Sequence, residues 1–123
     1  MSQPIIYHNP QCSKSEATLK ILEEKGYIPK IVEYLTTKLQ RQDLVELISM
    51  FDSEPLTLIR TKESLFKELG LSDKSDSEKL IAAIIEYPIL LERPIVVYKG
   101  KAKIGRPPEA VLTILDNIDE LTS

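Results

Sequence analysis

Two pairs of short β-favouring runs, one near each end of the chain, bracket a middle that is patterned for helices. The first pair is Ile5–Tyr7 and Ile31–Leu35. Between them lies a helical stretch in which Leu19 and Leu22 share a face and which Gly26 closes. A strand, a helix and a second strand within about thirty residues match the size of a βαβ unit. Such a crossover helix is what a parallel pairing of the two strands requires.

The second pair of runs predicts an antiparallel hairpin. Pro94–Tyr98 and Lys101–Ile104 are joined by Lys99-Gly100, which suits a tight turn. Pro107 and Pro108 then stand where prolines are favoured at a helix start. The apolar stripe of this last helix is Val111, Leu112, Ile114, Leu115 and Ile118.

The middle of the chain is predicted to be helical. Apolar residues recur at helical spacing over residues 44–51, 65–69 and 80–85, and Gly70 and Pro88 end the last two stretches. Two capping boxes are expected at helix starts, Ser13-x-x-Glu16 in the first helix and Ser75-x-x-Glu78 before the helix over 80–85.

This order of elements predicts an α/β, thioredoxin-like fold. The sheet is expected to be mixed and four-stranded, flanked by helices, with a helical insertion between the βαβ and ββα units. The 123 residues contain no internal repeat, low-complexity tract or linker, so residues 1–123 are predicted to form a single domain.

Charge and apolar content exclude several classes of function. The net charge of −3 and the pI of about 5.2 leave no general basic field for nucleic acid. The most apolar stretch, Leu80–Leu91, is interrupted by Glu86 and Pro88 and is too short to span a bilayer. The N-terminus lacks the features of a signal peptide, and one cysteine cannot form an internal disulfide. We therefore expect a cytoplasmic protein without a membrane or nucleic-acid partner.

The lone cysteine, Cys12, falls between a strand end and a helix start. Unpaired backbone N–H groups and the positive end of the helix dipole stabilise an anion there. A thiolate at such a position has a pKa below the free value of about 8.5, and the same N–H groups suit an oxyanion. The alternative is an inert buried cysteine, which the polar surroundings from Asn9 to Ser15 make the weaker interpretation.

His8, four residues before Cys12, is the only histidine. An imidazolium beside the sulfur would favour the thiolate. The alternative, a histidine that only bonds the loop backbone, is equally compatible with the spacing. No metal site is expected, because one cysteine and one histidine cannot fill a structural zinc sphere without carboxylates.

Arg60, Arg93 and Arg106 each stand at a junction between predicted elements. The planar donor fork of arginine suits a carboxylate, a phosphate or a similar oxyanion, although each one taken alone also fits a solvated surface position. Arg93 and Arg106 both precede a proline. The sequence leaves open whether the Arg93-Pro94 bond is cis.

Four ordered blocks of this chain resemble the signature of the glutaredoxin-coupled arsenate reductases, and the likeness runs from residue 5 to about residue 116. The blocks are Tyr7–Ser15, Leu58–Glu63, Glu92–Val97 and Ile104–Glu109. The resemblance implies a thioredoxin-like fold in which Pro94 is the cis-proline.

The same resemblance implies a role for each candidate residue. Cys12 would be the nucleophile, and His8 would help to lower its pKa. Arg60, Arg93 and Arg106 would form the oxyanion pocket, and Ser15 would support the cysteine loop.

The implied reaction begins with attack of the Cys12 thiolate on arsenate. Glutathione then displaces the adduct, arsenite leaves, and glutaredoxin reduces the remaining Cys12–glutathione disulfide. Because the chain has one cysteine, any disulfide-forming cycle needs an external thiol. The three-cysteine arsenate reductases of the phosphatase-like class are excluded by the same count. No bound cofactor is expected, and glutathione would be a co-substrate.

One residue departs from the family pattern. Many members carry a basic residue where this chain has Glu16, and a carboxylate there would repel arsenate and raise the pKa of the Cys12 thiol. An alternative substrate is therefore another oxyanion or a glutathionylated molecule. A further alternative is a non-catalytic, protein-binding regulator, since a related branch with this fold acts on RNA polymerase. That branch typically uses a C-x-x-C switch, whose second position is Ser15 here.

Overall fold

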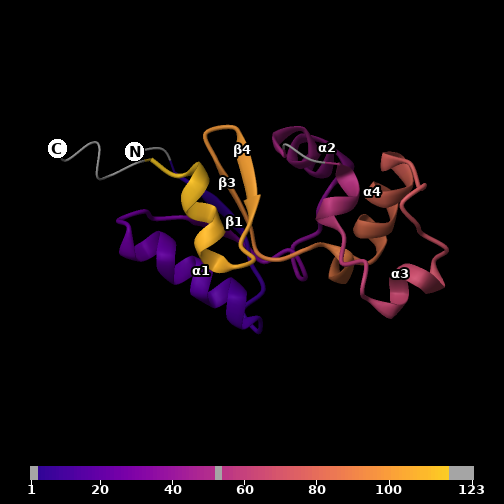
Figure 1. The fold of residues 1–123 in the computed structure, drawn as a ribbon, viewed down its shortest axis with the longest axis horizontal. Coiled ribbons are helices and arrows are strands. Elements are labelled where there is room, and N and C mark those ends of the chain that lie inside the picture. The colour runs from indigo at the N-terminus through magenta and orange to yellow at the C-terminus, as the bar shows by residue number, and fades with distance from the viewer. Residues whose placement is uncertain (1–2, 52–53, 117–123) are drawn as a thin grey trace.

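A four-stranded mixed sheet forms the centre of the computed structural model, which describes residues 3–51 and 54–116 (Figure 1). Its spatial order is β2-β1-β3-β4, with β1 and β2 parallel and the other two pairings antiparallel. The strands are β1 (Ile5–Tyr7), β2 (Lys30–Val32), β3 (Ile95–Tyr98) and β4 (Lys101–Ile104). The predicted thioredoxin-like sheet, with its crossover helix and its hairpin, is confirmed.

Helices cover both faces of this sheet. In Figure 1, α1 and the yellow helix η3 lie on one side, and α2, α3 and α4 gather on the other. The bounds are α1 (Ser13–Glu24), α2 (Arg41–Met50), α3 (Ser64–Glu68) and α4 (Ser77–Glu86), with 3-10 helices η1 (Pro55–Leu58), η2 (Pro88–Leu90) and η3 (Pro108–Ile114). The helical insertion between the βαβ and ββα units is therefore present.

Alternation along the strands divides the core into two clusters, because successive side chains of a strand point to opposite faces. Val96 and Tyr98 pack with Ile6 against Leu22 of α1 and Val111 of η3. The alternate residues of β3, Ile95 and Val97, face the helical insertion. The larger cluster there also includes Leu44, Leu47, Leu58, Leu80, Ile84 and Leu91. Each face of the sheet thus holds one helical layer in place.

Residues after η3 are tied to the hairpin through Asp116. Its carboxylate accepts hydrogen bonds from the Tyr98 hydroxyl and from Lys99 Nζ, the latter at 2.8 Å. Its backbone N–H donates to the Tyr27 hydroxyl at 3.1 Å. The predicted final helix is a 3-10 helix that ends at Ile114, and Ile118 of its expected stripe lies outside the described residues.

The two predicted capping boxes are wrong. Cys12, not Ser13, is the N-cap of α1, and the Glu16 carboxylate bonds His8 instead of a cap N–H. At α4 the N-cap is Asp76, whose Oδ1 accepts the Lys79 N–H at 2.9 Å. At α1 the helix already includes Ser13, and His8 takes the Glu16 carboxylate. At α4 the N-cap is the residue that follows Ser75.

The second strand is shorter than predicted. It ends at Val32, and the N–H groups of Thr36 and Thr37 both donate to the Glu33 carbonyl, which turns the chain. Tyr34, which was expected within this strand, instead lies in the turn and is buried. Two proline bonds, Arg93-Pro94 and Arg106-Pro107, are cis; only the first follows from the family resemblance. No helix among the described residues is long and apolar enough to cross a membrane.

Gly105 directly follows β4 and lies against Thr18 of α1 and Pro94. A Cβ at this position would lie 2.5 Å from Thr18 Oγ1 and 2.8 Å from Pro94 Cγ. The Thr18 hydroxyl is fixed by its hydrogen bond to the Lys14 carbonyl at 2.8 Å, so it cannot swing aside freely.

We therefore expect Gly105→Ala to lower the free energy of unfolding by about 1–3 kcal/mol, through overpacking. Urea denaturation measures the change. In a Thr18→Ala background the same substitution should cost less, because one of the two close contacts is gone. An equal cost in both backgrounds would contradict the steric explanation.

Candidate active site

The strand register brings three segments that are distant in sequence to the same end of the sheet. Tyr7, the last residue of β1, pairs with Ile95, and Ile95 pairs with Ile104 at the end of β4. The loop after β1, the residue pair before β3 and the pair after β4 therefore meet. These segments carry Cys12, Arg93 and Arg106, respectively.

The cysteine loop is held by its own hydrogen bonds. Asn9 accepts the Cys12 N–H on its carbonyl at 3.0 Å and the Gln11 N–H on Oδ1 at 3.0 Å. The Asn9 N–H in turn donates to Ser15 Oγ at 3.0 Å. Cys12 is thereby fixed as the N-cap of α1, and its side chain is half-buried.

This placement lowers the pKa of the Cys12 thiol. Partial burial alone would raise the pKa, but the backbone N–H groups of Ser15 and Lys14 in the first turn of α1 lower it, and so do the charges of Arg93 and Arg106. The net shift is downward even with Glu16 nearby. A helix N-terminus combined with two guanidinium groups thus favours the thiolate, as the sequence analysis expected of the helix end.

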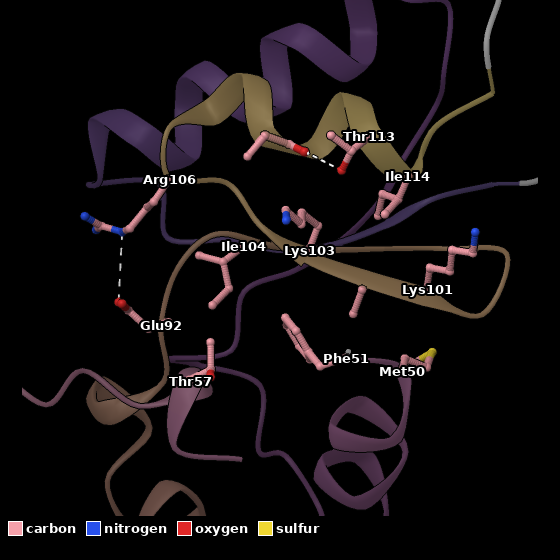
Figure 2. Close-up of a pocket in the computed structure, with 12 residues that line it drawn as sticks. Met50, Phe51, Thr57, Glu92, Lys101, Lys103, Ile104, Arg106, Thr113 and Ile114 are labelled. Carbon is pink, nitrogen blue, oxygen red and sulfur yellow. Dashed lines mark hydrogen bonds and ion pairs between the residues drawn. The ribbon is translucent and has the colours of Figure 1, made fainter. Parts of the chain in front are cut away.

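Arg106 contacts the sulfur directly. Its Nη2 lies 3.9 Å from Cys12 Sγ, while its Nε donates to the Arg93 carbonyl at 2.8 Å. Glu92 Oε1 lies 3.9 Å from the same Nε, a pair that Figure 2 shows. The guanidinium is therefore positioned from both sides, with one terminal nitrogen directed at the thiol.

Arg93 offers a donor that nothing else uses. Its Nε is fully buried and has no hydrogen-bond partner among the described residues. A buried donor without a partner costs free energy unless something accepts from it. An anion near Cys12 would supply that acceptor.

Arg60 lies at the margin of the site that Cys12, Arg93 and Arg106 form. It follows Ile59, which bridges to Leu91, and its backbone N–H donates to the Leu90 carbonyl at 2.8 Å. Its guanidinium contacts Glu63 Oε2 at 3.6 Å and the Ile89 carbonyl at 3.4 Å. Arg60 is not among the groups that shift the Cys12 pKa, so its place in the oxyanion pocket stays a prediction.

Tyr34 belongs to this site, and the sequence analysis missed it. Its side chain is 1% exposed, and burial raises the pKa of its hydroxyl to about 12, a rise that Arg93 and Arg60 oppose and Cys12 and Glu92 support. The hydroxyl therefore remains a neutral donor amid the charged residues of the site. The parallel pairing of Tyr7 with Val32 puts the end of β2 beside the cysteine loop. The signal in the sequence was therefore the position of Tyr34 just after a strand expected to lie parallel to the one before Cys12.

His8 lies behind the cysteine loop rather than in contact with the sulfur. The buried imidazole bonds Ser15 Oγ through Nδ1 at 2.7 Å and Glu16 Oε1 through Nε2 at 3.1 Å. Because the Asn9 N–H also donates to Ser15 Oγ, the hydroxyl is left to donate to Nδ1, and Nε2–H to donate to the carboxylate. His8 and Ser15 thus hold the loop together, and a direct effect of the imidazole on the thiol stays a prediction.

Together these residues can bind and attack an oxyanion. Backbone N–H groups and the guanidinium groups of Arg93 and Arg106 act on a sulfur that favours its ionised form. Within residues 3–51 and 54–116, no three His, Cys, Asp or Glu side chains gather in a way that could hold a metal ion.

Comparison with known proteins agrees with this arrangement. The sequence model of the ArsC family matches residues 7–114. The chain is 51% identical over 114 residues to the uncharacterized protein YfgD of Escherichia coli K12, covering 89% of this chain and 94% of that protein. It is 45% identical over 115 residues to an arsenate reductase of Neisseria meningitidis serogroup A, covering 89% and 96%, respectively.

Solved structures give the same result. An arsenate reductase from Vibrio cholerae superimposes with a TM-score of 0.88 at 45% identity, over 92% of this chain and 98% of that one. A putative arsenate reductase from Yersinia pestis superimposes with a TM-score of 0.84 at 47% identity, over 90% and 99%.

Replacing Arg106 should weaken the thiolate. We expect Arg106→Ala to raise the pKa of the Cys12 thiol, because a positive charge 3.9 Å from the sulfur is removed, so that the thiol reacts only at higher pH. The rate of alkylation by iodoacetamide as a function of pH measures this shift. Arg41→Ala is the matched control, since Arg41 is exposed and pairs with Glu78. An unchanged profile in Arg106→Ala, with the circular-dichroism spectrum intact, would count against the electrostatic role.

Proposed function

Because the chain belongs to the ArsC family, we propose that it is an arsenate reductase with Cys12 as the nucleophile. The observation that supports this most is the sulfur itself: its pKa is lowered, and a guanidinium nitrogen lies 3.9 Å away. A nucleophile and a receptor for an anion are therefore adjacent. Arsenate reductases among the relatives support the choice of oxyanion.

Arsenate would bind between the cysteine loop and the arginine pair. Arg93, whose charge helps to lower the pKa of the Cys12 thiol, would bind one arsenate oxygen through its guanidinium. Arg106 would bind a second oxygen through its terminal nitrogen, and its Nε would stay on the Arg93 carbonyl. The neutral Tyr34 hydroxyl would add a donor without adding charge. Arg60 would close the pocket by turning from Glu63 toward the anion.

The reaction would need two sulfurs and two electrons. The Cys12 thiolate forms a bond to arsenic, and an arsenate hydroxyl takes up one proton from solvent and leaves as water. The thiolate of glutathione then attacks the Cys12 sulfur, and the electron pair of the breaking sulfur–arsenic bond stays on arsenic, which leaves as arsenite. Arsenic is reduced by two electrons, and the two thiols are oxidised to a Cys12–glutathione disulfide.

A second protein, glutaredoxin, would regenerate the free Cys12 thiolate. A thiolate of glutaredoxin attacks the glutathione sulfur of the mixed disulfide and releases the Cys12 thiolate. A leaving thiolate of lowered pKa departs faster, so the features that activate Cys12 also speed this step. Glutathione and glutaredoxin are available where thiols are kept reduced, so we assign the protein to the cytoplasm.

A second candidate substrate is a glutathionylated molecule. The observation in its favour is Glu16, whose carboxylate stands in the first turn of α1 and is half exposed. A negative charge there opposes a small anion more than it opposes a neutral disulfide. The same thiolate would then attack the disulfide directly, with no arsenic intermediate.

The first test supplies arsenate, glutathione and glutaredoxin to the pure protein and measures arsenite. We expect turnover that Cys12→Ser abolishes. Arg93→Ala should raise KM about tenfold or more, because a charge-assisted hydrogen bond is worth about 1.5–3 kcal/mol. Arg41→Ala should behave as the unchanged protein. No arsenite above the Cys12→Ser level would remove arsenate as the substrate.

The second test changes the charge of Glu16 while keeping its hydrogen bond. In Glu16→Gln the amide oxygen still accepts from His8 Nε2, but the negative charge is gone. We expect KM for arsenate to fall by about two- to fivefold, the size of effect typical of exposed charges, and the difference to shrink at high salt. A KM that does not change would contradict the repulsion of arsenate by Glu16. Reduction of a glutathionylated peptide should be indifferent to the substitution.

A further inference from the structure

A groove runs along the outer edge of β4, outside the residues that hold the thiol (Figure 2). It has a volume of about 780 Å³. Strand β4 forms its floor, the end of α2 and η1 form one wall, and η3 forms the other. At one end it reaches Arg106 and Glu92.

The floor of this groove offers unpaired backbone groups. β4 is the last strand of the sheet, so one of its edges has no neighbour. The Gly105 N–H donates to the Pro94 carbonyl at 2.9 Å, and bonded and unbonded pairs alternate along an antiparallel ladder. With Ile95 opposite Ile104, it follows that Lys101 and Lys103 bond inward to β3. Ala102 and Ile104 direct their N–H and C=O groups into the groove.

The two walls differ in chemistry. Lys101 and Lys103 point toward the η3 side, whereas Ile104 points toward Phe51 on the opposite side (Figure 2). Both lysines are exposed, and neither forms an ion pair with a described residue. The groove is therefore basic along one wall and apolar along the other, on a chain whose net charge is −3.

We propose that this groove binds an extended segment of a partner protein, which adds to β4 as a fifth strand. Such a segment supplies backbone donors and acceptors at the spacing that Ala102 and Ile104 require. Side chains of a strand alternate between its two faces. Acidic side chains of the segment would face Lys101 and Lys103, and apolar ones would face Phe51 and Ile104.

The chemistry of the groove selects against other occupants. A small oxyanion would leave the backbone groups of Ala102 and Ile104 without partners. A nucleic acid would meet the apolar wall at Phe51 and Met50 and an acidic chain overall. A peptide strand that alternates acidic and apolar residues satisfies the floor and both walls together.

Arg106 connects the groove to the thiol. It lines one end of the groove, and its Nη2 lies 3.9 Å from Cys12 Sγ, so a segment that extends past this end would approach the reactive sulfur. This docking would bring a protein to Cys12 whether that protein is oxidised or reduced there. The proposal goes beyond arsenate reduction and does not depend on it.

The test uses a short synthetic peptide in which glutamate and valine alternate, together with the full-length chain. Amide hydrogen exchange, followed by NMR, should show that the Ala102 and Ile104 amides exchange fast in the free protein and become protected on binding. The Lys103 amide should be protected in both states, because it already bonds β3. The Cys12→Ser variant should bind equally, which separates docking from catalysis.

Peptide controls separate backbone pairing from charge alone. The same composition with glutamates and valines in separate blocks should bind weakly, as should a peptide with lysine in place of glutamate. N-methylation of the alternating peptide along one edge should abolish binding, since it removes the pairing N–H groups. Equal binding of the N-methylated and unmodified peptides would overturn the proposal.

Charge reversal in the groove provides the protein control. We expect Lys101→Glu together with Lys103→Glu to weaken binding by about tenfold or more, because like charges would then face each other. Lys38→Glu with Lys74→Glu, two exposed lysines outside the groove, should leave the affinity within about twofold. Protection that appears away from β4, or no protection in any titration, would also overturn the proposal.

Discussion

The pairing of Ile95 with Tyr7 on one side and Ile104 on the other decides where the reactive side chains lie. A shift of one residue in either ladder would invert the alternation that divides the core into two clusters. It would also carry Arg93 or Arg106 away from the cysteine loop. The packing of both sheet faces and the geometry of the site therefore depend on the same register, so the site is as rigid as the core beneath it.

Two guanidinium groups lie beside one another at this edge, and their mutual repulsion is offset in three ways. Arg106 Nε donates to the Arg93 carbonyl, Glu92 lies close to the same nitrogen, and the thiolate balances part of the charge. Arg93 Nε still lacks an acceptor among residues 3–51 and 54–116. The site thus holds a buried donor without an acceptor beside two guanidinium groups, and this makes it a prepared receptor for an anion.

The order of elements along the chain, the helical insertion and the cysteine at a helix start could be predicted, because each depends on local periodicity or on turn residues. The predictions that failed depend on competition between partners. Ser13-x-x-Glu16 has the form of a capping box, yet a buried imidazole takes the Glu16 carboxylate. Tyr34 was placed in a strand, and only the turn at Glu33 reveals that it faces the charges of the site. No pattern in the sequence indicates how far Arg60 turns toward Glu63.

Ser15 stands one helical turn from Cys12, where a second sulfur would be needed to protect the first. A thiolate of lowered pKa that is open to solvent is also the form most readily converted to sulfenic acid. With a hydroxyl in that place, the chain cannot trap the sulfenic acid as an internal disulfide, and further oxidation is irreversible. Small thiols from solution are therefore the partners that can capture the sulfenic acid, and a peroxide that acts where those thiols are scarce would oxidise Cys12 irreversibly.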